Sequence, residues 1–278
     1  MFDPVFSIFD MLCIGAAIAK NLASKGCSLV LNYTSDSSSS PIEKLVSDLE
    51  SQHNVRAISV QADMGSTAGP AHIVNTAKNN FSHPKTGAFR IDILINNAGV
   101  AADSPLQNIT PEDFTRQYSV NVLGPLLLVQ AALPYLPQDR SGRIVNISSV
   151  SSSLGFVNQT VYGGTKNALE AMTRTWSREL AERATVNSVN PGPVATDMYG
   201  GTREEFQLQM KPFIQTAPLM AARRGVDEDQ YVDDAERAGG RPGYDFEIAG
   251  VVAMLCSEDS AWCTGSVVCA NGGFKFSY

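Results

Sequence analysis

The chain has 278 residues, of which 44% are hydrophobic and 18% charged, and this suits one globular α/β domain with a full core. Its formal net charge of -7 argues against nucleic acid or an anionic membrane as a partner. No apolar run approaches the ~20 residues of a membrane span, and residues 1–12 lack the basic start of a signal peptide. We therefore expect a cytoplasmic protein with no membrane anchor.

The cysteines also fit a reducing compartment. There are five of them, an odd number, and no pair has the C-x-x-C spacing of a metal site. We expect buried free thiols, no disulfide framework and no bound metal at Cys13, Cys27, Cys256, Cys263 and Cys269.

Strand-like and helix-like segments alternate along the chain, which is typical of a parallel sheet with helices on both faces. The expected strands are 2–8, 28–33, 56–63, 91–95, 143–147, 185–189 and 266–269. The expected helices are 15–25, 41–52, 67–81, 111–135 and 161–183. Together they predict a Rossmann-like α/β fold, with a doubly wound parallel sheet of about seven strands in one domain over residues 1–278.

Residues 200–243 break this alternation, because they are charged and irregular. Their place after the turn Asn190–Pro193 predicts a substrate lid, and a solvated loop is the alternative. Phe206, Met210 and Phe213 in this region hint at an apolar ligand, although ordinary core packing explains them about as well.

A candidate proton-transfer pair is formed by Tyr162 and Lys166, which lie four residues apart and so on one face of an expected helix. A phenol has an unperturbed pKa of about 10, and an ammonium one turn away is expected to lower that pKa. Such a phenol can give a proton to a carbonyl oxygen or take one from an alcohol. The spacing also occurs by chance, with the Tyr ring packed on the lysine stem.

Two further polar residues favour the chemical interpretation of this pair. Ser149 follows an expected strand, and ligands bind at the carboxyl ends of parallel strands. Asn121 lies inside an expected helix, where an Asn is unfavourable, so a task for its side chain is expected. The simpler alternatives are a turn serine within the run Ser148–Ser153 and a buried hydrogen bond between helices.

Taken together, the motifs resemble those of the short-chain dehydrogenase/reductase family in order and spacing, from about Gly15 to Gly273. The matching motifs are Asn96-Asn97-Ala98-Gly99, Asn121, Ser149, Tyr162-x-x-x-Lys166 and Pro191-Gly192-Pro193-Val194-Ala195-Thr196. Within the family, the chain resembles fungal ketoreductases that act on aromatic or polyketide ketones, and 3-oxoacyl carrier-protein reductases.

The resemblance implies an NADPH-dependent oxidoreductase of secondary metabolism that reduces a small-molecule ketone to an alcohol. Tyr162 would be the general acid/base, and Lys166 would lower its pKa and hold the nicotinamide ribose. Ser149 would orient and polarise the carbonyl, and Asn121 would hold a water in a proton relay. The resemblance also implies a homodimer or homotetramer formed through the long helices.

The cofactor-binding residues implied by the resemblance lie at the ends of successive strands. They are Ile14, Gly15, Asn32, Tyr33, Asp63, Met64, Asn97, Ala98, Gly99, Tyr162, Lys166, Pro191, Gly192, Val194 and Thr196. We expect NADP(H) rather than NAD, because no acid stands in the stretch 31–35 at the end of the second strand to repel a 2′-phosphate. Asp36 is the alternative ribose ligand if that strand extends further.

The N-terminus departs from the family pattern, in which a glycine-rich turn lets backbone N–H groups approach the pyrophosphate. Phe9 and Cys13 stand where two of the glycines belong, and Pro4 lies in the expected first strand. Residues 1–12 are therefore expected to form a degraded first strand and phosphate loop. A wrong gene model and a genuinely divergent chain both explain this departure, and the complete catalytic set favours the gene-model explanation.

Two other classes of function stay open. A cofactor-impaired, non-catalytic homologue of the family would show no turnover even with glycine restored at positions 9 and 13. A lyase or epimerase on the same fold would cause no net consumption of NADPH, because a fold alone does not determine the reaction.

We predict weakened dinucleotide binding, because the side chains of Phe9 and Cys13 stand where the backbone must approach the pyrophosphate. A fluorescence titration of the chain with NADPH measures this affinity. Micromolar or tighter binding would contradict the prediction.

Overall fold

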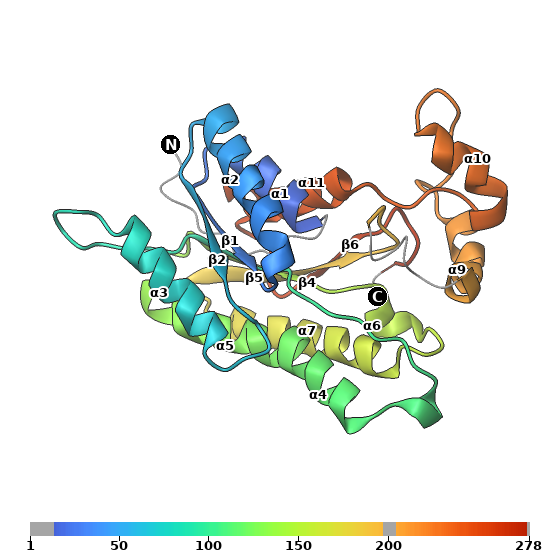
Figure 1. Ribbon diagram of the computed structural model, residues 1–278, viewed down its shortest axis with the longest axis horizontal. Helices are drawn as coiled ribbons and strands as arrows, with labels where there is room; N and C mark the ends of the chain where they lie inside the picture. Colours follow the sequence, from blue (N-terminus) through green and yellow to red (C-terminus); the bar gives the residue numbers. More distant parts are fainter. Residues whose placement is uncertain (1–13, 197–203, 277–278) are drawn as a thin grey trace.

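Short aliphatic segments of the chain form six parallel strands in the computed structural model, which describes residues 14–196 and 204–276. The strands are β1 (Leu29–Tyr33), β2 (Ala57–Gln61), β3 (Ile93–Asn96), β4 (Gly142–Ile147), β5 (Ala184–Pro191) and β6 (Val267–Ala270). Every pairing among them is parallel, in the orders β1-β2 and β3-β4-β5-β6. All six therefore point their carboxyl ends toward one edge (Figure 1).

The order of the described strands agrees with a doubly wound sheet. A doubly wound sheet has the order 3-2-1-4-5-6, in which the first strand of the chain lies between the second and the fourth. In this protein that place falls between β1 and β3, which belong to separate sheets within the described residues. The strand expected at residues 2–8 lies outside the described residues. The predicted Rossmann-like α/β fold is confirmed.

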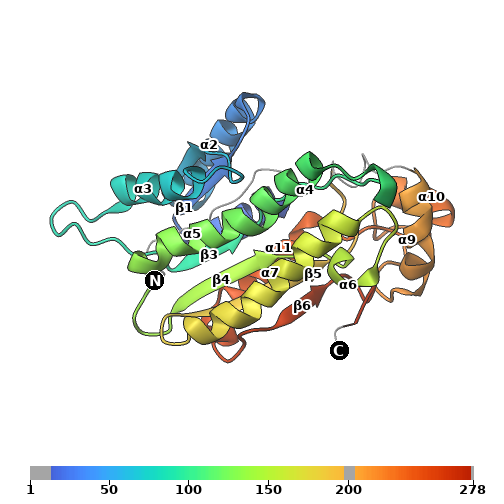
Figure 2. The same cartoon turned by 90° about the horizontal axis from the view of Figure 1, so that it is seen from below.

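Helices cover both faces of the strands, as Figures 1 and 2 show. One face carries α1 (Ile14–Ala23), α2 (Ser39–His53) and α11 (Asp245–Leu255). The other face carries α3 (Gly69–Phe81), α4 (Pro111–Tyr118), α5 (Gly124–Ala132) and α7 (Thr160–Glu179). The described part also contains the short helix α6 (Ser151–Leu154), and α9 (Glu204–Thr216) and α10 (Asp229–Ala238) at the same end of the molecule as α6.

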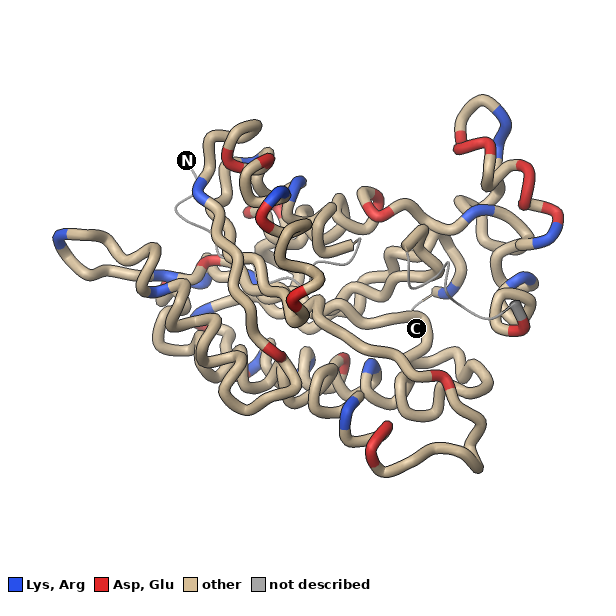
Figure 3. Tube along the Cα trace, in the orientation of Figure 1, with Lys and Arg blue, Asp and Glu red and all other residues tan. Residues whose placement is uncertain are grey.

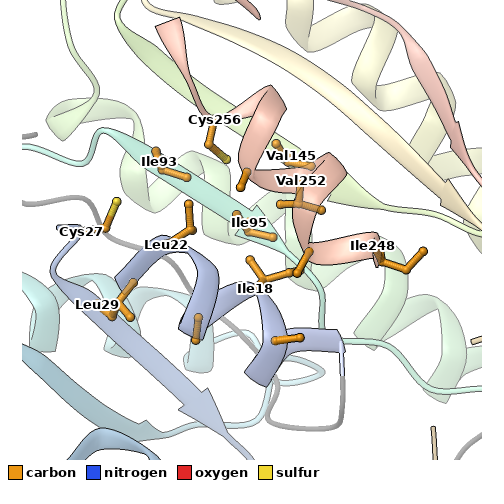
Figure 4. Close-up of a cluster of buried hydrophobic side chains, with 14 of the residues drawn as sticks. Ile18, Leu22, Cys27, Leu29, Ile93, Ile95, Val145, Ile248, Val252 and Cys256 are labelled. Carbon is orange, nitrogen blue, oxygen red and sulfur yellow. The ribbon is translucent and has the colours of Figure 1, made fainter. Parts of the chain in front are cut away.

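The packing of α1 against α11 forms the centre of one core layer. Ile18 and Leu22 of α1 meet Ile248 and Val252 of α11 above the sheet residue Ile95 (Figure 4). Sequence analysis did not predict α11, because its apolar residues form a nearly continuous run. Periodicity alone cannot distinguish such a run from a buried strand.

The region 200–243 is also more regular than expected, since it contains α9 and α10. Met210 and Ile214 of α9 are buried in a separate cluster together with Val150 and Phe274. The chain then returns to α11 through Arg241, whose guanidinium pairs with Asp227 at 2.9 Å and Glu247 at 2.8 Å. The expectation of an irregular segment is therefore wrong, while its role as a lid stays a prediction.

Charged side chains lie mainly on the helices and loops around the strands (Figure 3). Arg143 is the one charged residue within the six described strands. It is buried, and its guanidinium donates to the carbonyls of Ser257, Arg140, Ser141 and Gly142. Backbone oxygens thus replace the water that this charge loses on folding.

Two further properties of the described residues concern the requirements of a membrane span and of a metal site. Of the helices that are described, none is long and apolar enough to cross a membrane. Across residues 14–196 and 204–276, no group of three or more His, Cys, Asp or Glu side chains is placed to hold a metal ion. Cys27, Cys256, Cys263 and Cys269 are free thiols, and Cys13 lies outside the described part.

Substitution of Ile248 by alanine tests the packing between α1 and α11. Ile248→Ala is expected to lower the free energy of unfolding by about 2–5 kcal/mol, because it leaves a cavity in a closed core. Met254→Ala on the same helix is the matched control, since that side chain is 51% exposed and Ile248 only 3%. Denaturant titration measures both, and equal losses would contradict the assigned packing.

Candidate active site

Helix α7 carries the expected proton-transfer pair to the carboxyl edge of the sheet. Lys166 is buried, and its ammonium donates a hydrogen bond of 2.8 Å to the carbonyl of Ile147, the last residue of β4. The ammonium nitrogen lies 5.7 Å from the centre of the Tyr162 ring, one turn earlier on the helix. The structure thus brings together the two residues that the spacing indicated.

Asn121 lies in a π-helical turn, Ser119–Leu123, between α4 and α5. Its amide nitrogen donates to the carbonyl of Val100 at 2.8 Å and to the hydroxyl of Thr165 at 3.0 Å, and its amide oxygen accepts from the N–H of Val100 at 2.8 Å. The long helix expected at 111–135 therefore contains a π turn in its middle. π turns are rare and are frequent at functional sites.

Gly99 joins this group through the close approach of its backbone. A β-carbon on Gly99 would lie 3.2 Å from the ammonium nitrogen of Lys166 and 3.5 Å from the amide oxygen of Asn121. A larger residue would therefore crowd the ammonium. Three segments that are distant in sequence, after β3, in the π turn and in α7, meet at one point.

Ser149 follows the end of β4 beside Tyr162. Its hydroxyl donates to the hydroxyl of Ser151 at 3.1 Å and accepts from the N–H of the same residue at 3.1 Å. The expected turn role of this serine is therefore real. Ser149 also acts on the phenol of Tyr162, whose pKa it lowers.

The pKa of Tyr162 differs from the sequence-based expectation. Burial raises this pKa to about 12, the hydrogen bond with Ser149 opposes the rise, and the carboxylate of Asp103 adds to it. The expectation of a lowered pKa is wrong, because the loss of water around the phenolate has the largest effect. Tyr162 is thus a neutral phenol near pH 7, which is the form that donates a proton.

The pKa of Lys166 shifts in the opposite direction to that of Tyr162. Burial lowers it to about 8, and the carboxylate of Glu170 opposes this effect. The side chain is therefore mostly an ammonium at neutral pH. Sequence analysis did not single out Glu170, although its position four residues after Lys166 is a recognisable helical pair.

At the end of β1, the expected role of Asn32 needs correction. Its side chain is fully buried and donates to the carbonyls of Val60 at 3.2 Å and Ala62 at 2.8 Å, so it ties β1 to β2 and does not face a ligand. Tyr33 is partly buried and packs against the core. β1 ends there, and the carboxylate of Asp36 accepts from Gln61 at 2.6 Å.

The other expected cofactor residues lie at or near the same edge. Asp63 is exposed and accepts from the N–H of Gly65 at 2.8 Å, while Met64 is buried. Asn97 and Ala98 line one small cavity together with Met64. The first two residues of α1 and the segment after β5 complete the set: Ile14, Gly15, Pro191, Gly192, Val194 and Thr196.

The doubly wound sheet is typical of proteins that bind a dinucleotide at the carboxyl edge. The serine, tyrosine, lysine and asparagine at this edge add groups that can transfer protons, as in oxidoreductases that act on carbonyls and alcohols. The profile of the short chain dehydrogenase family matches residues 11–207. The chain belongs to this family of dehydrogenases and reductases.

Relatives with assigned activities match nearly the whole chain. It is 56% identical to an L-xylulose reductase of Aspergillus niger, over 95% of this chain and 94% of that protein. It is 50% identical to an L-xylo-3-hexulose reductase of Hypocrea jecorina, over 95% of this chain and 93% of the relative. The crystal structure of a blue fluorescent protein from a metagenomic library, in complex with NADPH, matches with a TM-score of 0.80 and 31% identity, over 98% of both chains.

Replacement of the Tyr162 hydroxyl tests its role as the proton donor. Tyr162→Phe is expected to lower kcat by roughly 10²–10⁴-fold, because general acid catalysis contributes about that much. Tyr135→Phe is the matched control, since its hydroxyl contacts Lys78 near the opposite end of the strands. Steady-state assays compare the two, and wild-type turnover in Tyr162→Phe would disprove the assignment.

Proposed function

We propose that this protein uses NADPH to reduce the ketone of an open-chain, polyhydroxylated ketose to an alcohol. The observation that carries the proposal is the placement of the Tyr162 phenol one turn from the Lys166 ammonium, with the nitrogen 5.7 Å from the ring centre, at the carboxyl edge of the sheet. The two fungal relatives described above are named for reduction of L-xylulose and L-xylo-3-hexulose, which are sugars of this class.

The carboxyl edge fits a nicotinamide dinucleotide with a 2′-phosphate. Gly99 leaves room for close approach next to Lys166, where the nicotinamide ribose would lie. Beyond β1, the hydroxyl of Ser35 lies 2.8 Å from that of Ser37 and 3.1 Å from that of Ser38, and these hydroxyls offer donors for a phosphate. Asp36 lies beyond the end of β1 and is engaged by Gln61, so it does not take the place of the acid that NAD-binding sites use.

The described residues divide the reaction among them. Bound NADPH would supply the hydride to the carbonyl carbon. Ser149 would donate a hydrogen bond to the carbonyl oxygen, and Tyr162 would give that oxygen its phenolic proton. The Lys166 ammonium would hold the ribose hydroxyls, and Asn121 would hold the water that returns a proton through Lys166.

The polar surroundings of Tyr162 support a hydroxylated substrate. Gln159, three residues earlier, is 8% exposed, and its amide nitrogen donates to the carboxylate of Asp103 at 3.2 Å. The amide oxygen of Gln159 is buried and has no hydrogen-bond partner, so a substrate hydroxyl would satisfy it. By contrast, Phe206 and Phe213 contact Phe156 at ring distances of 5.4 and 5.9 Å, which supports packing as their role.

We further propose that the protein works in the cytoplasm as a homodimer or homotetramer and that residues 200–243 close over the substrate. Phe114 and Leu123 are exposed apolar side chains on the long helical segment expected at the interface, which supports an oligomer. The position of α9 and α10 at the same end of the molecule as α6 supports the lid.

The substrate proposal is tested by following NADPH oxidation with L-xylulose and with acetophenone, a ketone that has no hydroxyl. We expect kcat/KM to favour the ketose by about 10²-fold or more, because a site built for hydroxyls rejects analogues that lack them. A preference for acetophenone would support an aromatic ketone instead, and conversion of a sugar without net NADPH oxidation would indicate an epimerase or lyase.

Gln159→Leu sharpens this test. The change should lower kcat/KM for the ketose by roughly 10-fold or more, because one hydrogen bond to the substrate is lost, and should leave acetophenone turnover nearly unchanged. Gln138→Leu, at an exposed position, is the matched control. Equal losses with both ketones would count against hydroxyl recognition by Gln159.

A further inference from the structure

We infer that Glu170 is a positioning residue of the active site, whose buried carboxylate keeps Lys166 protonated and holds the end of β4 next to the end of β5. The inference rests on the proposed function, because it assigns Glu170 a part in the same proton transfer. The hydrogen-bond partners of Glu170 are Ser148 and Asn190, so it acts on the site through them and through its charge.

The carboxylate of Glu170 occupies a closed position between α7 and the sheet. Glu170 is 6% exposed. One carboxylate oxygen accepts from the hydroxyl of Ser148 at 2.6 Å and from the amide nitrogen of Asn190 at 3.1 Å. Burial of an ionised carboxylate is unfavourable unless hydrogen bonds and an opposite charge compensate for it.

Both partners of this carboxylate connect it to the site. The hydroxyl of Ser148 also lies 3.3 Å from the carbonyl of Lys166. The amide nitrogen of Asn190 also donates to the carbonyl of Ser149 at 2.8 Å. Glu170 therefore orients the amide that fixes the backbone of Ser149, the residue expected to polarise the substrate carbonyl.

The second connection is electrostatic and acts on Lys166. Its ammonium faces the carbonyl of Ile147 from β4, Gly99 from the loop after β3, and the neutral phenol of Tyr162. Asn121 approaches from the π turn as an uncharged amide, and Asn190 of β5 is also uncharged. The carboxylate of Asp103 raises the pKa of Tyr162.

Within this environment, Glu170 is the acidic group that acts on the lysine. Burial lowers the pKa of Lys166 to about 8, and the Glu170 carboxylate opposes this lowering. Without the carboxylate, the pKa of Lys166 would fall further. An uncharged lysine could donate fewer hydrogen bonds to the ribose and could not pass a proton on.

Glu170→Gln separates the charge of this side chain from its shape. Glutamine retains an amide oxygen that can accept from Ser148 and Asn190, but it carries no charge. We expect the midpoint of Lys166 titration to fall by about one pH unit, in line with the effect of a nearby opposite charge. NMR of selectively ¹⁵N-labelled lysine side chains in the cofactor-free protein measures this midpoint independently of turnover.

The same shift should appear in the kinetics. In wild-type protein, the rate of ketone reduction should fall as the pH rises through about 8, because Lys166 loses its proton there. In Glu170→Gln this decline should begin about one unit lower, while the rate at pH 6 stays within about threefold of wild type, because Lys166 is still an ammonium there.

Two further variants make the test decisive. Glu170→Asp keeps the charge and should return the titration midpoint to within about half a unit of wild type. Glu179→Gln, at an exposed position on the same helix, should leave it unchanged. An unshifted midpoint in folded Glu170→Gln, or equal shifts in Glu170→Gln and Glu170→Asp, would overturn the inference. Absence of ketose turnover in wild type would instead overturn the proposed function and leave the NMR result valid.

Discussion

The hydrogen bond from the Lys166 ammonium to the carbonyl of Ile147 organises the candidate active site. At 2.8 Å, it attaches α7 to the last residue of β4. The loop after β3 then passes so close to the ammonium that a β-carbon at position 99 would crowd it. Because the ammonium is buried, each group around it must be an oxygen, an amide or a carboxylate. This one hydrogen bond therefore fixes both the packing of α7 on the sheet and the position of the ammonium in the site.

Much of the fold could be predicted from the sequence, because parallel strands buried on both faces are continuous apolar runs between amphipathic helices. The same rule explains the failure at α11. That helix is also buried and also nearly continuous in apolar residues, so only its packing on α1 reveals its conformation. The charged region 200–243 conceals two helices for the opposite reason, since few of its apolar residues mark a buried face.

The sequence spacing predicts which residues form the site, but it does not predict the direction of their pKa shifts. The spacing of Tyr162 and Lys166 correctly predicts their proximity, yet it cannot reveal how much water the surrounding elements exclude. That exclusion decides the pKa of both groups. Asn32 shows the same limit, because its position at the strand end is right while its side chain turns inward toward β2.

The π-helical turn at Ser119–Leu123 also restricts how this chain can change during evolution. Such a turn contains one residue more than an α-helical turn. Deletion of a single residue there would close the wide turn and remove the local geometry that holds the Asn121 side chain against Val100 and Thr165. The position of Asn121 in the site therefore depends on the number of residues in this turn, whereas the loop at 82–90 contains no residue of the site.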